Sequence, residues 1–224
     1  VAGQFYFDDP EKLRLQIKNS FLHELGPGKL PGDPDSNRKI MGAVVPHAGY
    51  MFSGAAAAFV YKAFAEAKKP ETVVIIGPNH TGLGSGLSVY PGGKWRTPLG
   101  DLDVDEELAR AVLKNGEMID LDETAHKYEH SIEVQLPFIQ YIWGNDIRIL
   151  PICMMLHDLD ASDDVAYSVV DGAEDIGREI VILASSDFSH YVPERVAKEL
   201  EELAIQTILK MDEERLIKVI ERKK

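Results

Sequence analysis

Short apolar runs alternate along this chain with longer stretches in which apolar residues recur at helical spacing. Four of the runs are rich in β-branched residues and predict strands at 43–45, 73–76, 147–150 and 180–183. The second and fourth runs are apolar throughout, which is typical of strands covered on both faces. Strands that alternate with helices predict one α/β domain over 1–224, with a mainly parallel central sheet flanked by helices on both faces.

The helical stretches carry residues that begin, end or interrupt helices. Asp9 is a candidate cap for a first helix whose apolar positions recur every four residues as far as Leu25. Asp103 is the predicted cap of a helix that ends at Gly116. Further helices are predicted over 53–69, 129–143, 193–211 and 212–223. In the second of these, Pro137 is expected to kink the helix or to start it anew.

Three of the seven histidines lie just past predicted strands. His47, His80 and His190 follow the first, second and fourth of the apolar runs, respectively. Ligands of open parallel sheets bind beyond the carboxyl ends of the strands. A single histidine at such a place is more often structural, but three at equivalent places favour a shared site. Because imidazole is a ligand for iron, zinc, copper and nickel, we predict a mononuclear metal-type pocket with these three residues as its core.

A fourth polar cluster lies within 125–133. If a helix starts near Glu129, His130 and Glu133 share one face at its N-terminal end. A helix N-terminus favours an anion, so this segment could hold a carboxylate or phosphate group of a substrate. An ordinary solvated helix start with charges four residues apart explains His130 equally well, and His126 is the weaker candidate.

The composition narrows the classes of partner and compartment. Acidic residues exceed basic ones by 37 to 24, giving a formal charge of −13, which argues against nucleic acid or an anionic membrane as a partner. No apolar run approaches the roughly 18 to 20 residues that span a bilayer, and the start shows no signal pattern. The single cysteine, Cys153, cannot form an intramolecular disulfide, so we predict a cytoplasmic protein. Its apolar surroundings predict a buried small residue rather than a nucleophile.

Six short motifs resemble, in this order, those of the Memo family, whose members occur in archaea, bacteria and eukaryotes. The motifs are VAGQFY at 1–6, VPHAGY at 45–50, GPNH at 77–80, WRTPLG at 95–100, EHSIE at 129–133 and SSDFSH at 185–190. Together they extend over nearly the whole chain, which makes the resemblance highly specific.

The resemblance implies a fold like that of class III extradiol dioxygenases, which are non-haem iron enzymes. It implies that His47 and His80 ligate a metal, iron(II) or copper, and that His190 occupies the place of an acid–base histidine. Asp187 would orient His190 or complete the metal shell. Members of the family are also linked to redox activity, to binding of phosphopeptides or signalling partners in animals, and to a radical-SAM protein in microbes.

A departure from the family pattern concerns the third metal ligand. Family members usually carry it as a cysteine in a Cys-Gly motif after the last predicted helix, whereas this sequence runs to Lys224 without one. Cys153 does not match that motif. Members also usually extend a few residues before Val1, so we expect the chain to be cropped at both ends. The resemblance therefore supports two ligands within these residues.

Three functions remain open from the sequence. The first is a metal-dependent oxidoreductase in which His190 acts as general base toward a phenol-like hydroxyl group, since a histidine pKa of about 6.5 suits this transfer. The second is a non-catalytic binding module for a peptide or a small anionic ligand. The third is a metal carrier. The predicted substrate-binding residues are Tyr50, Asn79, His130 and Glu133.

Overall fold

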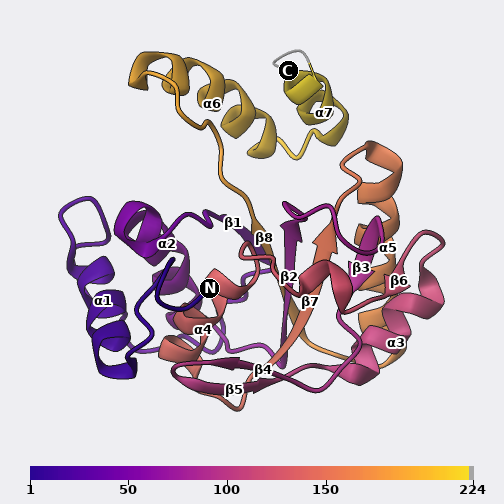
Figure 1. Ribbon diagram of the computed structural model, residues 1–224, viewed down its shortest axis with the longest axis horizontal. Helices are drawn as coiled ribbons and strands as arrows, with labels where there is room; N and C mark the ends of the chain where they lie inside the picture. The colour runs from indigo at the N-terminus through magenta and orange to yellow at the C-terminus, as the bar shows by residue number, and fades with distance from the viewer. Residues whose placement is uncertain (222–224) are drawn as a thin grey trace.

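A six-stranded sheet crosses the centre of the computed structural model, which describes residues 1–221 (Figure 1). Its strands are, in spatial order, β1 Gly42–Val45, β8 Ile180–Ser185, β2 Thr72–Pro78, β7 Arg148–Met154, β3 Leu87–Val89 and β6 Asp120–Leu121. The first four run parallel, and β3 joins β7 in the antiparallel direction. The predicted mainly parallel sheet is confirmed, and all four predicted strands lie in it.

Alternation along the central strands directs side chains into two cores. In β2, Val73 and Ile75 pack into one buried cluster, whereas Val74 packs into the other. In β7, Ile149 and Leu150 divide in the same way. Successive side chains of a strand point to opposite faces, so a strand buried on both sides is apolar at every position.

The expectation of two covered faces is correct for β2 and correct in part for β8, one face of which is only partly covered. Val181 and Leu183 of β8 are fully buried, whereas Ile180 and Ile182 are half-buried. Apolar composition alone does not distinguish a strand with two covered faces from one with a partly open face.

Helices cover both faces of the sheet, as predicted (Figure 1). One face packs against α1 Pro10–Leu22, α2 Tyr50–Ala65 and α4 Leu136–Trp143. The other packs against α3 Glu106–Asn115 and α5 Leu159–Asp175. A short antiparallel hairpin of β4 Lys94–Thr97 and β5 Gly100–Asp103, which the sequence did not predict, lies at the lower edge in Figure 1.

Several helix boundaries differ from the predicted ones. Leu25 lies outside α1 and is 74% exposed. Asp105, rather than Asp103, caps α3, because Asp103 pairs within the β4–β5 hairpin. The predicted helix over 129–143 is α-helical only from Leu136, with Pro137 in its first turn, so this proline starts the helix anew.

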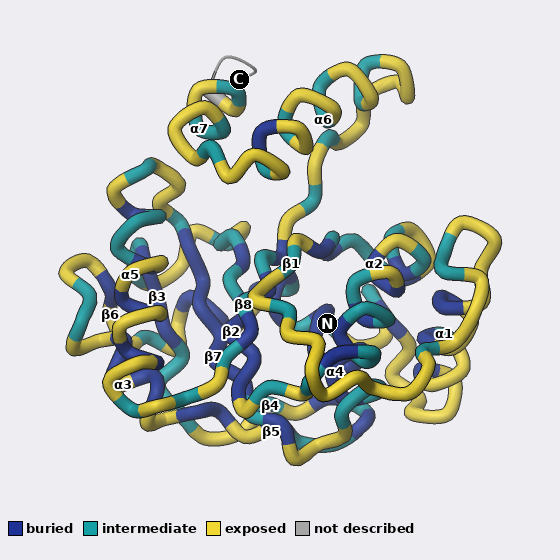
Figure 2. Tube along the Cα trace, turned by 180° about the vertical axis from the view of Figure 1, so that it is seen from behind, coloured by how far each residue is buried: buried dark blue, intermediate teal, exposed yellow. Residues whose placement is uncertain are grey.

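Two further helices, α6 Glu194–Ile208 and α7 Glu213–Glu221, lie above the sheet in Figure 1. The predicted positions 222 and 223 of the last helix lie outside the described residues. Figure 2 shows that both helices are largely exposed, whereas the central strands β2 and β7 are largely buried. Within residues 1–221, no helix combines the length and apolar character that crossing a bilayer requires.

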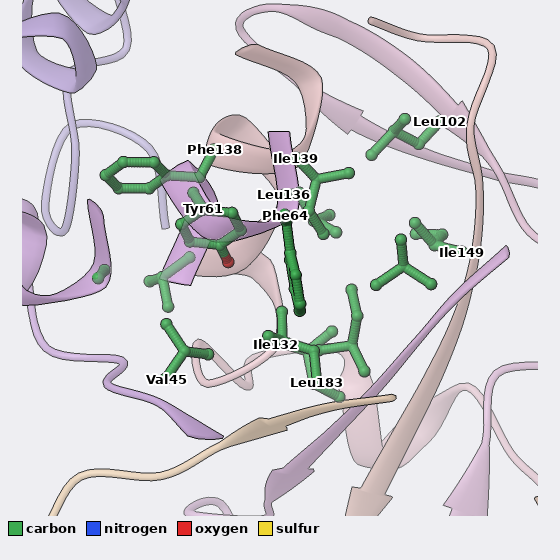
Figure 3. Packing of buried hydrophobic residues seen from close by; sticks show 14 of the residues in the cluster. Val45, Tyr61, Phe64, Leu102, Ile132, Leu136, Phe138, Ile139, Ile149 and Leu183 are labelled. Carbon is green, nitrogen blue, oxygen red and sulfur yellow. The ribbon is translucent and has the colours of Figure 1, made fainter. Parts of the chain in front are cut away.

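An aromatic group anchors α4 to α2 in the core (Figure 3). Phe138 stacks on Tyr61 with ring centroids 4.6 Å apart and an interplanar angle of 8°. Tyr50 lies 4.9 Å from the Phe138 ring, and Phe21 of α1 meets it edge-on at 5.8 Å. This packing fixes the start of α4, and with it the preceding segment that carries His130.

Candidate metal centre

Three histidines converge at the carboxyl ends of the strands. His47 follows β1, His80 follows β2, and His130 lies in the segment before α4. Each offers one candidate ligand nitrogen, and these atoms all lie within 4.8 Å of one another. The ring centroids are 5.3 Å apart for His47 and His80, 5.5 Å for His47 and His130, and 4.6 Å for His80 and His130. We call these residues the histidine cluster.

A buried carboxylate orients the second histidine of the cluster. Glu129 accepts hydrogen bonds from Nδ1 of His80 at 2.8 Å and from its backbone nitrogen at 2.6 Å. Because a carboxylate only accepts, Nδ1 of His80 carries a proton, and in the neutral form of the ring Nε2 has the free lone pair. This is the carboxylate–histidine arrangement that supports metal ligands in proteins.

Glu129 also fixes the chain around the third histidine. Its carboxylate accepts from the backbone nitrogens of His130 at 2.9 Å and Ser131 at 2.8 Å. Burial raises the pKa of Glu129, but the hydrogen bonds from His80 and Ser131 outweigh burial and hold the pKa below its usual value. Glu129 is therefore an anion whose charge faces the histidine cluster.

His130 is held by rings on both sides. Its imidazole stacks on His80 at 4.6 Å and on Phe5 at 4.4 Å, with interplanar angles of 21° and 25°. The predicted α-helix start at Glu129 is wrong, because α4 begins at Leu136 after a 3₁₀ turn over Glu133–Gln135. The orientation of His130 depends on Phe5 and Glu129, two residues of the family motifs to which the sequence assigned no role.

His47 is the most buried member of the histidine cluster, at 3% exposure. Its Nδ1 lies 3.1 Å from the Ser185 hydroxyl, and its backbone nitrogen donates to Asp187 at 2.7 Å. Burial lowers the pKa of His47, against an opposing effect of Asp187, and burial likewise lowers the pKa of His130. Both imidazoles are therefore neutral near pH 7, which is the form that ligates metals.

His190 lies outside the histidine cluster but is connected to it. Its Nε2 is 3.4 Å from Oδ2 of Asp187, and the same oxygen is 3.8 Å from Nε2 of His47. The His190 side chain is 58% exposed, whereas Asp187 is 15% exposed. Of the three histidines predicted to form the core, the structure brings His47 and His80 together and places His130, rather than His190, beside them.

The other predicted substrate-binding residues use their polar atoms within the protein. The Tyr50 hydroxyl donates to the backbone oxygen of Val134 at 2.7 Å. The Asn79 amide accepts from the backbone of its own loop and donates to Leu83 at 2.7 Å. Glu133 accepts from the Tyr6 hydroxyl at 2.7 Å. Of the four residues predicted to bind substrate, His130 is the one that belongs to the histidine cluster.

Cys153 is a buried structural residue, as predicted. It is fully buried on β7, and its thiol contacts the backbone oxygen of Ala125 at 3.7 Å. Burial raises the pKa of Cys153 to about 12. The thiol is therefore protonated at neutral pH and is a poor nucleophile and metal ligand.

His126 is buried away from the histidine cluster, between Tyr90 and Trp95. Its Nε2 lies 3.1 Å from the Ser88 hydroxyl, and its Nδ1 has no hydrogen-bond partner among residues 1–221. Protonation would place an unpaired charge in the core, so burial lowers the pKa of His126 from 6.5 to about 4.

Replacing His126 by glutamine is expected to make stability less dependent on pH. In the parent chain, His126 of the unfolded state is protonated near pH 6.5, whereas His126 of the folded state is protonated only near pH 4. The free energy of unfolding therefore has its full value above pH 6.5 and falls as the pH is lowered toward 4. From about pH 7.5 to pH 5 the parent should lose about 2 kcal/mol more unfolding free energy than His126→Gln. Urea titrations at both pH values measure this. The prediction is contradicted if the free energies of unfolding of the two chains change equally between about pH 7.5 and pH 5. Above about pH 7.5 the difference between the two chains should be constant.

The fold and the site together define a class of protein: an α/β protein with a candidate metal centre at the carboxyl ends of its parallel strands. The model of the Memo family, described as "Memo-like protein", matches residues 1–224. The chain therefore belongs to the Memo family, and the resemblance inferred from the six motifs is confirmed.

Curated proteins of the same family are similar to this chain over nearly its whole length. The MEMO1 family protein of Methanopyrus kandleri is 50% identical over 222 residues, which cover 99% of this chain and 78% of that protein. The MEMO1 family protein of Desulfurococcus amylolyticus is 50% identical over 221 residues, covering 98% and 78%. That of Sulfolobus acidocaldarius is 47% identical over 226 residues, covering 100% and 80%.

Proposed function

We propose that this chain binds one ion of iron(II) or copper through His47, His80 and His130 and uses it in an oxidoreductase-type reaction. The observation that carries the proposal is the convergence of three imidazole nitrogens within 4.8 Å. Burial favours the neutral, ligating form of His47 and His130, and Glu129 leaves Nε2 of His80 free.

The donor set fits this choice of metal. Imidazole nitrogens suit iron and copper, and three protein ligands leave coordination positions for a substrate or for water. A bound ion of either metal would supply one-electron redox chemistry and would polarise an oxygen atom of the substrate. Glu129 faces the histidine cluster with a negative charge that favours a cation there.

The chain itself supplies a path for a proton. Asp187 lies between the buried His47 and the exposed His190. A hydroxyl-bearing substrate held at the histidine cluster could release its proton toward His190, whose exposure allows exchange with water. His190 is therefore the proposed proton acceptor, and Asp187 orients it.

Metal titration of the apoprotein tests the proposal. The apoprotein is titrated with iron(II) under anaerobic conditions and, separately, with copper, in competition with a chelator of known affinity. One equivalent should bind and should remain after gel filtration. Oxygen uptake by the loaded protein with phenol-type compounds then separates an oxidoreductase from a metal carrier. A chain that retains neither metal is not a metal protein of this kind.

A further inference from the structure

We propose that Ser185, Gln135 and Tyr61 form a buried hydrogen-bond relay that fixes the ring proton of His47 on Nδ1. The relay would present the Nε2 lone pair of His47 to the histidine cluster. The consequence for metal affinity rests on the proposed function, whereas the position of the proton is a property of the metal-free chain.

The relay begins at a backbone carbonyl that fixes the Gln135 amide. The amide nitrogen of Gln135 lies 3.0 Å from the backbone oxygen of Pro46 and 2.8 Å from the Ser185 hydroxyl. Because a carbonyl oxygen only accepts, the nitrogen end of the amide must face Pro46. Its two protons then go to Pro46 and Ser185, and its oxygen accepts from the Tyr61 hydroxyl at 2.7 Å.

A second carbonyl fixes the proton of Ser185. The Ser185 hydroxyl lies 2.6 Å from the backbone oxygen of Ser131, which also only accepts. The single hydroxyl proton of Ser185 is therefore donated to Ser131. One lone pair of Ser185 accepts from Gln135, and the other is available to His47 at 3.1 Å. The nitrogen of His47 that faces Ser185 must then be the donor.

The opposite tautomer leaves a buried contact unsatisfied. If His47 carried its proton on Nε2, Ser185 would have to donate to Nδ1. The oxygens of Ser185 and Ser131, 2.6 Å apart, would then face each other without a proton between them. An unmade hydrogen bond in the interior costs more than the same bond contributes when it is made, so the Nδ1–H form is favoured.

Burial keeps water from replacing any member of the relay. Tyr61 is fully buried, Gln135 is 1% exposed and Ser185 is 3% exposed. A buried chain of hydrogen bonds in which every donor and acceptor is paired specifies one arrangement of protons. The relay joins α2, the turn before α4 and the end of β8 to the histidine cluster.

Long-range ¹H–¹⁵N NMR spectra of the metal-free chain, labelled at histidine, report the tautomer directly. Near pH 8, His47 should be in the Nδ1–H form. In Ser185→Ala the hydroxyl acceptor is lost and the backbone of residue 185 is the partner that remains, so His47 should shift in part toward the Nε2–H form, and metal affinity should fall by about 10-fold. Ser185→Thr keeps a hydroxyl and should restore both properties. His80 is the internal control, because Glu129 holds its proton in every variant.

An Nε2–H form of His47 in the unsubstituted chain overturns the proposal, and so does an unchanged tautomer in Ser185→Ala. If Ser185→Ala fails to fold, the spectrum of the unsubstituted chain still decides the position of the proton. If the tautomers behave as expected but no metal binds, the proposed function fails and the relay stands.

Discussion

Alanine in place of His130 is expected to lower the affinity of the chain for iron(II) or copper by more than about 100-fold. Its ring lies with His47 and His80, and all three candidate ligand nitrogens are within 4.8 Å of one another. Loss of an outer-shell partner already weakens metal sites by about 10- to 100-fold, so loss of a direct ligand should cost more. Competition titration with a chelator measures the change in affinity.

His190→Ala is the matched comparison. Its place after a strand made His190 a candidate for the pocket and the family resemblance gave it an acid–base role, whereas the structure places His130 beside His47 and His80. The exposed His190 contacts the histidine cluster only through Asp187, so its removal should leave metal affinity nearly unchanged. Its removal should instead slow any reaction that needs a proton acceptor. If His190→Ala loses the metal and His130→Ala retains it, the ligand set proposed from the structure is wrong.

The position of the candidate site could be predicted from the sequence, because it depends on which residues directly follow the apolar runs that form strands. His47 and His80 each follow an apolar run, and parallel strands present their carboxyl ends at one edge of a sheet. This argument needs only the identity of the strands and their common direction. It also placed Asp187 and His190 near the same edge, although it could not rank the three histidines by distance.

The role of His130 could not be derived in the same way, because the apolar spacing of 129–143 predicts one helix. In the structure, the Glu129 side chain accepts from the backbone nitrogens of His130 and Ser131. Side chains that bond to nearby backbone groups compete with helix formation. The resulting turn directs His130 toward His80, and its cause is a contact between Glu129 and the loop after β2 that no local pattern shows.

The cap of α3 shows a similar limit. Both Asp103 and Asp105 can cap a helix by residue type, and Asp103 has the glutamate spacing of a capping box. Pairing of β4 with β5 places Asp103 opposite Lys94, so the helix starts after Asp105. Competition between a strand and a helix for the same residues is decided by tertiary contacts, which explains why boundaries are harder to predict than elements.

Phe138→Ala is expected to lower the free energy of unfolding by about 3 to 5 kcal/mol. The Phe138 ring is 1% exposed and lies against Tyr61, Tyr50 and Phe21, so its removal leaves a cavity lined by large rings that cannot readily close it. Urea denaturation followed by circular dichroism measures the loss.

Phe52→Ala is the control for Phe138→Ala, because the Phe52 side chain is 80% exposed on α2. It should change the free energy of unfolding by no more than about 0.5 kcal/mol. Phe138 also holds Tyr61, whose hydroxyl donates to Gln135. The cavity should therefore loosen the relay as well, and the folded fraction of Phe138→Ala should show a mixed tautomer at His47. Equal stability losses in the two variants would mean that the packing of Phe138 does not stabilise the core, and an unchanged His47 tautomer would mean that it does not support the relay.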